Sequence, residues 1–236
     1  VANEAGHFGI YASRSHDIIP ISDCLIAGEE LHVEQIALEK YEPMEPIEVP
    51  QGDQIKEVKG KKLIVKAGAF WQRHQNAPET LTSAFLDLAK LKSGEHLLDL
   101  YGGVGLFSSV AIDQLGAGGR IDLIESSIPA TESARGNFKN FQNVNVLRED
   151  VAKALKNIKR ADVVVLDPPR AGAGAEVVNQ LLRINPSRIV YVACDPISLA
   201  RDLKDFLAAG YKIQAIKAFD LFPHTHHFET VVSLVR

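Results

Sequence analysis

From about residue 96 onwards, short apolar segments alternate with longer stretches that carry apolar residues at helical spacing. The short segments are rich in β-branched residues and have the length of strands, so they predict a sheet. They are His96–Leu100, Arg120–Glu125, Val144–Arg148, Ala161–Asp167, Arg188–Cys194, Lys212–Phe219 and Phe228–Val235. A helix is predicted between each successive pair of the first six strands, and this alternation indicates a parallel sheet with helices on both faces.

The last two predicted strands are joined by a loop, residues 220–227, that contains no helical pattern. The final strand should therefore run antiparallel to its neighbour. Seven strands with a reversed last strand are the arrangement of Rossmann-like methyltransferases, so the predicted fold class is α/β of that type, although a fold by itself does not establish a function.

The N-terminal part has a different pattern, with short alternating segments, and Pro43, Pro46 and Pro50 break up any long helix. The segment Phe8–Tyr11 and the segment Lys61–Lys66 predict short strands, whereas Leu31–Tyr41 predicts a short helix. We therefore expect two domains: a small β-rich module over residues 1–66 and a larger α/β domain over residues 67–236.

Composition and charge restrict the classes of protein. No segment approaches the roughly 18 consecutive apolar residues of a membrane span, and the first residues lack a signal-peptide pattern, so we expect a cytoplasmic protein with no membrane partner. Cys24 and Cys194 form no CxxC pair, so neither a cysteine-ligated zinc nor an iron–sulfur cluster is expected. The net charge of −4 argues against a protein that coats nucleic acid, but it allows an enzyme with a local basic face.

A glycine-rich segment, LDLYGGVGLF at 98–107, follows the first of the seven strands and opens a helix. Gly102, Gly103 and Gly105 allow a tight turn and a close approach to a ligand, and the helix N-terminus offers backbone N–H groups. The spacing departs from GxGxxG, which weakens an NAD interpretation. It resembles the S-adenosylmethionine loop D-x-[FY]-x-G-x-G, and a tight turn without a ligand is the alternative.

Acidic residues follow the next two strands. Glu125 could accept hydrogen bonds from both ribose hydroxyls of a nucleotide cofactor, or it could be a solvated acid at a strand end. Asp150 could contact the adenine edge, or it could cap a helix that starts at Val151.

Two further strands end in reactive groups. The segment DPPR at 167–170 resembles the [DN]PP[FY] motif of amino-methyltransferases, with Arg170 in the aromatic position, and its prolines should hold Asp167 rigidly. Cys194 ends another strand just before a helix N-terminus, which favours the nucleophilic thiolate, although most free cysteines are buried small hydrophobes.

A thiolate beside a methyl donor has a specific use. Carbon 5 of a pyrimidine is a poor nucleophile, and addition of a thiolate to carbon 6 makes it able to take a methyl group. The proton on carbon 5 must then leave, and Glu229 is the candidate base. We expect no metal site at the three histidines that precede Glu229, because no ligand set is complete; a contact to RNA phosphate or positioning of Glu229 is favoured. These histidines are His224, His226 and His227.

Three motifs together resemble the RNA (uracil-5-)methyltransferase family, whose members read DPPR, SC[ND]P and P-x-T-x-H-[VI]-E. This chain has DPPR at 167–170, ACDP at 193–196 and FPHTHHFE at 222–229. The segment 99–107 is similar to the family's DLYCGxGxF loop, and Phe70–Gln72 is similar to its FFQ-x-N segment.

The resemblance implies that residues 67–236 form an S-adenosylmethionine-dependent methyltransferase domain that methylates carbon 5 of a uridine in tRNA or rRNA. Cys194 matches the nucleophile and Glu229 the proton acceptor, and Asp167 would also lie near the target base. The implied contacts to S-adenosyl-L-methionine are Gln72, Tyr101, Glu125 and Asp167, and the arguments above add Gly103, Gly105 and Asp150. The family's iron–sulfur cysteines and a TRAM-like RNA-binding module are not visible in the sequence.

Other functions stay open at this point. Cytosine-5 methylation of RNA would use the same thiol chemistry, whereas amino-group methylation through the DPPR segment would not need Cys194. A non-catalytic RNA-binding module would need neither Cys194 nor Glu229, so the presence of both favours an enzyme.

Overall fold

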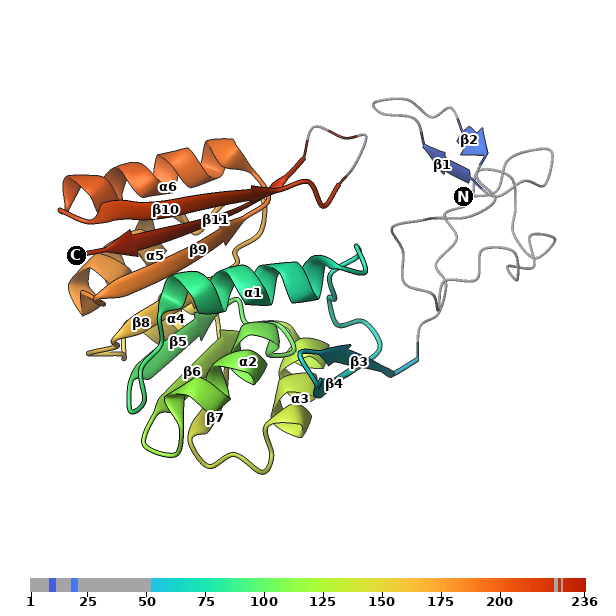
Figure 1. Cartoon of the computed structure of the whole chain (residues 1–236), viewed down its shortest axis with the longest axis horizontal. Coiled ribbons are helices and arrows are strands. Elements are labelled where there is room, and N and C mark those ends of the chain that lie inside the picture. Colours follow the sequence, from blue (N-terminus) through green and yellow to red (C-terminus); the bar gives the residue numbers. More distant parts are fainter. Residues whose placement is uncertain (1–8, 12–17, 21–51, 223–224, 226) are drawn as a thin grey trace. The chain divides into compact units, whose positions relative to one another are not determined.

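The computed structural model (Figure 1) describes residues 9–11, 18–20, 52–222, 225 and 227–236. The chain divides into two compact units, one of residues 1–51 and 73–75 and the other of residues 52–72 and 76–236. In the first unit, strands β1 (Gly9–Tyr11) and β2 (Ile18–Pro20) pair antiparallel. The helix predicted at residues 31–41 lies outside the described residues.

The second unit is built on a seven-stranded sheet with the order β10-β11-β9-β8-β5-β6-β7. The strands are β5 (His96–Leu100), β6 (Arg120–Glu125), β7 (Val144–Arg148), β8 (Val163–Leu166), β9 (Arg188–Ala193), β10 (Lys212–Phe219) and β11 (Glu229–Val235). Strands β5 to β9 pair in parallel, whereas β11 is antiparallel to both β9 and β10. The predicted α/β class with a reversed last strand is confirmed.

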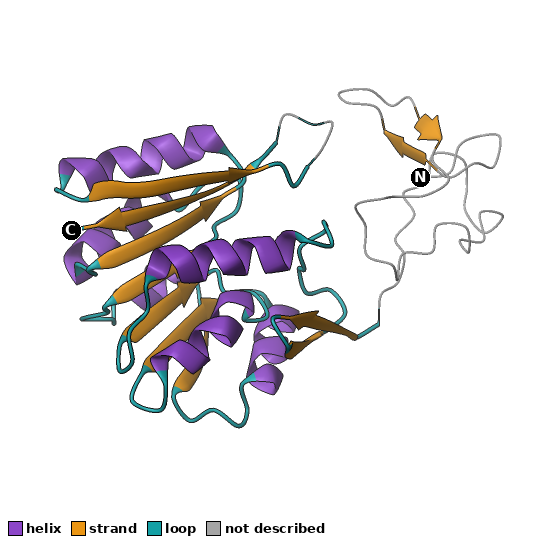
Figure 2. Ribbon diagram, viewed as in Figure 1, coloured by secondary structure: helices purple, strands orange, loops and turns teal. Residues whose placement is uncertain are grey.

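Helices cover both faces of the sheet (Figure 2). They are α1 (Ala77–Ala89), α2 (Leu106–Leu115), α3 (Ile128–Asn137), α4 (Val151–Leu155), α5 (Gly174–Ile184) and α6 (Pro196–Ala208). Alternate residues of each central strand face opposite sides. One face therefore packs against α1, α2 and α3, and the other against α4, α5 and α6.

A two-stranded hairpin of β3 (Gln54–Val58) and β4 (Lys61–Val65) joins the second unit. One face of the hairpin is buried, because Val58 and Leu63 pack on Leu106, and Val65 packs on Val104, whereas Ile55 and Ile64 are exposed. The structure thus groups the hairpin with the large sheet and places the boundary at residues 51 and 52, whereas the sequence suggested 66 and 67. The assignment of two domains stays a prediction.

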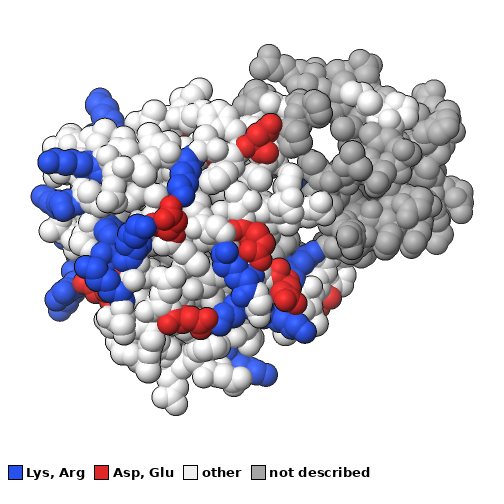
Figure 3. Space-filling view, viewed as in Figure 1, with Lys and Arg blue, Asp and Glu red and all other residues white. Residues whose placement is uncertain are grey.

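The surface carries charges of both signs. On the face shown in Figure 3, lysine and arginine side chains alternate with aspartate and glutamate rather than forming one basic area. Ion pairs such as Lys217–Asp87 and Lys61–Asp113 join surface charges of opposite sign. None of the described helices has both the length and the apolar character of a membrane span.

Candidate active site

Three neighbouring strands bring Asp167, Cys194 and Glu229 to one edge of the sheet. Strand β9 lies between β8 and β11. Thr230 and Ala193 form the last pair of the antiparallel ladder between β11 and β9, and Glu229 and Cys194 are the residues that directly adjoin this pair. Asp167 directly follows β8, which pairs in parallel with β9 on its other side. The strand order therefore gathers the three residues that the sequence had singled out for chemistry.

Glu229 sits in an environment that favours its neutral form. It is 5% exposed, and its Oε2 has no hydrogen-bond partner among the described residues. Burial raises the pKa of Glu229 to about 7. Burial and the charges of Glu229 and Asp99 raise the pKa of Asp167 well above its ordinary value. A carboxyl that titrates near neutral pH is suited to exchanging protons with a substrate.

Cys194 is partly buried between these two carboxyls. Burial raises the pKa of the Cys194 thiol, the charges of Glu229 and Asp167 raise it further, and Arg170 lowers it. The sequence suggested that the N-terminus of α6 would favour the thiolate. In the structure Asp195 caps that helix by accepting a hydrogen bond from Ser198 N at 2.7 Å, and the net shift of the Cys194 pKa is upward.

The glycine loop lies between β5 and α2 and is bonded to the end of β6. Gly103 has φ of 55° and donates from its N–H to Glu125 Oε2 at 3.1 Å. A Cβ at Gly103 would meet nothing within 4 Å, so there is open space beside this turn. Gly105 has φ of 96°, and a Cβ there would lie 2.2 Å from Phe138. Glu125 Oε1 accepts from Ser127 N at 2.7 Å and from Ser126 Oγ at 3.4 Å, whereas Oε2, which accepts from Gly103, keeps a lone pair for a ligand.

Tyr101 precedes the glycines in an unusual backbone conformation. Its φ of 58° is in the left-handed region, which is uncommon for residues other than glycine and tends to occur at functional sites. Burial and the charges of Asp150 and Asp202 raise the pKa of Tyr101 to about 12. Asp150 caps α4 by accepting from Lys153 N at 3.0 Å, which is the structural alternative that the sequence offered for it.

Gln72 is partly buried and follows Trp71 in the segment that connects β4 to α1. Trp71 packs on Leu106 and on Val104, the two residues that flank Gly105. The packing of Trp71 therefore holds Gln72 near the glycine loop. Six of the predicted cofactor-binding residues thus lie around the carboxyl ends of β5, β6 and β7, and Asp167 follows the neighbouring strand β8. The six are Gln72, Tyr101, Gly103, Gly105, Glu125 and Asp150.

Several functional candidates were not selected from the sequence. Asp99 is buried in β5, where its Oδ2 accepts from Ser108 N and Oγ, while its Oδ1 has no partner among the described residues. Burial raises the pKa of Asp99 to about 7. Tyr191 and Asp202 form a buried pair close to the DPPR loop, with Oη and Oδ2 2.8 Å apart.

Of the three histidines that precede Glu229, only His227 belongs to the described residues. His224 and His226 lie outside the described residues, whereas the ring of His227 meets the ring of Phe222 edge-on at 6.3 Å. Across the part of the chain that the structure describes, no group of three or more His, Cys, Asp and Glu residues is arranged to hold a metal ion.

Comparison with known proteins places these observations in a family. The model of a family described as tRNA (Uracil-5-)-methyltransferase matches residues 27–236. An uncharacterized RNA methyltransferase of Streptomyces avermitilis is 36% identical over 278 residues, which cover 97% of this chain and 64% of that protein. Another, from Thermotoga maritima, is 38% identical over 189 residues, which cover 79% of this chain and 42% of that protein. The chain therefore spans about two fifths to two thirds of the length of these curated relatives.

Solved structures of methyltransferases are similar to this chain as well. The tRNA (uracil-54, C5)-methyltransferase of Pyrococcus abyssi, in complex with S-adenosyl-L-homocysteine, has a TM-score of 0.68 and 30% identity, covering 78% of this chain and 45% of that chain. Fibrillarin of Aeropyrum pernix, with natively bound S-adenosyl-L-methionine, has a TM-score of 0.55 at 18% identity, covering 80% and 85%. The second likeness shows the fold alone.

Proposed function

The chain belongs to the tRNA (uracil-5-)methyltransferase family, and on this premise we propose that it transfers a methyl group from S-adenosyl-L-methionine to carbon 5 of a uridine in tRNA or rRNA. The observation that carries the proposal is the convergence of Cys194, Glu229 and Asp167 at one sheet edge, next to the glycine loop. The cytoplasmic location and the identity of the RNA stay predictions.

The residues around the glycine loop fit a nucleoside cofactor. Open space lies beside Gly103, and Glu125 keeps acceptor capacity for ribose hydroxyls. Gln72, Tyr101 and Asp150 would complete the site. When bound, S-adenosyl-L-methionine supplies an electrophilic methyl group.

The thiol chemistry requires proton movements that these side chains can make. Cys194 gives its proton to the carboxylate of Asp167, which leaves Glu229 ionised for the later step, and the Cys194 sulfur then forms a bond to carbon 6 of the uracil. The electron pair of the carbon 5–carbon 6 double bond moves towards O4, where a protonated Asp167 can donate a hydrogen bond. Carbon 5 would then take the methyl group as the bond between that group and the cofactor's sulfur breaks. Glu229 accepts the carbon 5 proton, the bond between the Cys194 sulfur and carbon 6 breaks to restore the double bond, and the Cys194 thiolate recovers its proton from Asp167.

The substrate uridine must leave its base stack, because carbons 5 and 6 have to face the thiol and the methyl donor in one pocket. An exposed aromatic side chain can stack on an unstacked base. Phe70 is 66% exposed and is free to take this part. Trp71 and Phe222 pack against apolar clusters instead.

A covalent trap tests the proposal. Fluorine at carbon 5 cannot leave as a proton, so tRNA and rRNA substituted with 5-fluorouridine should form a stable, once-methylated adduct with the chain in the presence of S-adenosyl-L-methionine. Cys194→Ala should form none, while the matched control Cys24→Ala should behave as the unchanged protein. Denaturing gels and intact mass give both results, and the RNA that reacts identifies the substrate class.

The alternatives give different results in the same experiment. Adducts with RNA containing 5-fluorocytidine instead would indicate cytosine methylation. Methyl transfer that survives Cys194→Ala would indicate an amino group as acceptor. Binding of S-adenosyl-L-methionine without any adduct or methylated RNA would refute the proposed activity of this chain.

A further inference from the structure

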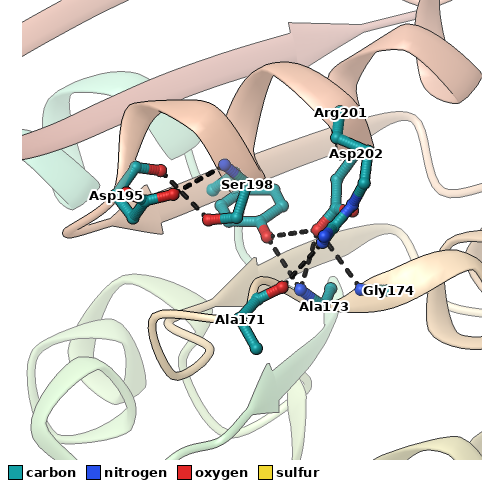
Figure 4. A network of polar contacts seen from close by, with 8 residues as sticks. Ala171, Ala173, Gly174, Asp195, Ser198, Arg201 and Asp202 are labelled. Atoms are coloured by element: carbon teal, nitrogen blue, oxygen red, sulfur yellow. Dashed lines mark hydrogen bonds and ion pairs between the residues drawn. The ribbon is translucent and has the colours of Figure 1, made fainter.

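A buried carboxylate holds the loop that follows Asp167 (Figure 4). It belongs to Asp202 on α6, whose side chain is 2% exposed. Its Oδ2 accepts hydrogen bonds from Tyr191 Oη at 2.8 Å, Ala173 N at 2.7 Å and Gly174 N at 3.2 Å. Ala173 N also donates to Tyr191 Oη at 3.0 Å. Two backbone amides of the loop are thus tied to one carboxyl and one hydroxyl.

A second set of contacts closes the same loop. Asp202 Oδ1 accepts from Arg201 Nε at 3.0 Å and from Arg201 Nη2 at 2.9 Å, and this Nη2 also donates to Ala171 O at 2.7 Å. Gly172, with φ of 80°, lies so close that a Cβ there would be 2.6 Å from both Arg201 Nη2 and Asp202 Oδ2. Four consecutive residues of the loop, 171–174, are therefore in contact with this network.

One role of Asp202 is to cap α5. The first N–H groups of a helix lack intrahelical partners, and Ala173 at the N-cap position has no side-chain acceptor. A carboxylate at a helix N-terminus also interacts favourably with the helix dipole. This role alone would make Asp202 important for stability only.

The network also connects the elements of the proposed active site. The loop that it holds begins at Asp167 and contains Arg170. Tyr191 lies three residues before Cys194 on β9, and α6, which carries Asp202, begins at Pro196 directly after the Cys-Asp pair. The same hydrogen bonds therefore join the loop that presents Asp167 to the strand and helix that present Cys194.

We propose that Tyr191 and Asp202 are positioning residues, which fix the loop carrying Asp167 and Arg170 relative to Cys194 so that the uracil is held in line for attack. The inference rests on the proposed function. Neither residue touches the substrate in this scheme. Catalytic groups have to be held within about 0.5 Å of their productive geometry, and a misplacement of about 1 Å can slow a reaction by about 100-fold.

Tyr191→Phe is the sharpest variant, because it removes one hydroxyl and keeps a ring in the fully buried core. Tyr211→Phe is a matched control. Tyr211 is buried in the same apolar cluster, and its Oη donates to Pro186 O at 2.7 Å near the amino end of β9, away from Cys194. Asp202→Asn is the second test variant.

Three quantities are measured on the full 236-residue chain: the rate of adduct formation with 5-fluorouridine RNA, the dissociation constant of S-adenosyl-L-methionine, and hydrogen exchange at Ala173 and Gly174. We expect Tyr191→Phe and Asp202→Asn to exchange these amides faster and to form adduct at least about tenfold more slowly. Cofactor affinity should fall by a smaller factor than the adduct rate, because Gln72, Glu125 and the glycine loop are not members of this network. Tyr211→Phe should match the unchanged protein in all three.

Two results would overturn the inference. Faster exchange with an unchanged adduct rate would mean that the network only caps α5, and unchanged exchange would mean that it does not hold the loop. If Asp202→Asn does not fold, Tyr191→Phe decides. Absence of adduct with the unchanged protein would instead refute the proposed function, and it would do so before any variant is compared.

Discussion

Replacement of Glu229 by glutamine should stabilise the protein while stopping turnover. Glutamine imitates the neutral carboxyl, which is the form that the buried site favours. Burial raises the pKa of Glu229 from 4.5 to about 7. A shift of this size corresponds to about 3 kcal/mol of unfolding free energy.

The sign of the pH dependence follows from the raised pKa. Below about pH 4.5 the carboxyl is neutral in both the folded and the unfolded protein, so its contribution to stability is fully present. As the pH rises towards 7, the unfolded chain ionises while the folded protein resists, and the unfolding free energy falls. This decrease should be absent in Glu229→Gln. The unfolding free energy of the variant should therefore exceed that of the unchanged protein by near zero at pH 4.5 and by as much as about 3 kcal/mol at pH 8.

Urea unfolding followed at several pH values between 4.5 and 8 would measure this difference. Glu57→Gln is the matched control, because Glu57 is exposed on β3 and its replacement removes the same charge without a buried site. A Glu229→Gln variant that is no more stable than the unchanged protein at pH 8 would refute the reasoning. The same variant should accumulate adduct on ordinary uridine RNA, because the proposed acceptor of the carbon 5 proton is gone.

Two further changes test the cofactor loop and the acid stability. Gly105→Ala should lower stability by at least about 2 kcal/mol and abolish binding of S-adenosyl-L-methionine in calorimetry, because a Cβ would lie 2.2 Å from Phe138 at a φ of 96°. Burial acts to raise the pKa of Asp122, but hydrogen bonds lower it overall to about 2. The protein should therefore lose about 2 kcal/mol of unfolding free energy as the pH falls from 5 to 2. The Asp122→Asn variant should lose much less over the same pH range. The donors of these bonds are His96, Arg120 and Asn145.

Most of the sheet could be predicted from the sequence because each strand is a short run of apolar, β-branched residues, which is a local signal. The observed bounds of β5, β6, β7 and β10 match those predicted from the sequence, and the others differ by only one or two residues. The hairpin of β3 and β4 was harder to assign, since nothing local tells that Val58 and Leu63 are buried against Leu106 of a helix far along the chain.

The candidate site could be predicted in part. Cys194 and Glu229 were selected by their chemistry and their motifs, but their proximity depends on β9 lying beside β11, which spacing in the sequence does not determine. The upward shift of the Cys194 pKa could not be predicted from the sequence, because it arises from burial and from carboxyls on other strands. The sequence did contain a signal for Asp202. It lies on the buried side of α6 with Leu199 and Phe206, and an acidic residue at helical spacing among apolar residues must have a hydrogen-bond partner when it is buried.

The raised pKa values of the buried carboxyls suit the proposed reaction on RNA. Asp99, Asp167 and Glu229 all favour their neutral forms, so near neutral pH this edge of the sheet carries less negative charge than its composition suggests. A thiolate at Cys194 is disfavoured while Glu229 and Asp167 are ionised, and it becomes more favourable when either carboxyl holds a proton. Movement of the thiol proton to a neighbouring carboxylate therefore forms the nucleophile without increasing the total negative charge. In the proposed reaction, that balance would let the nucleophile form beside the phosphate groups of RNA.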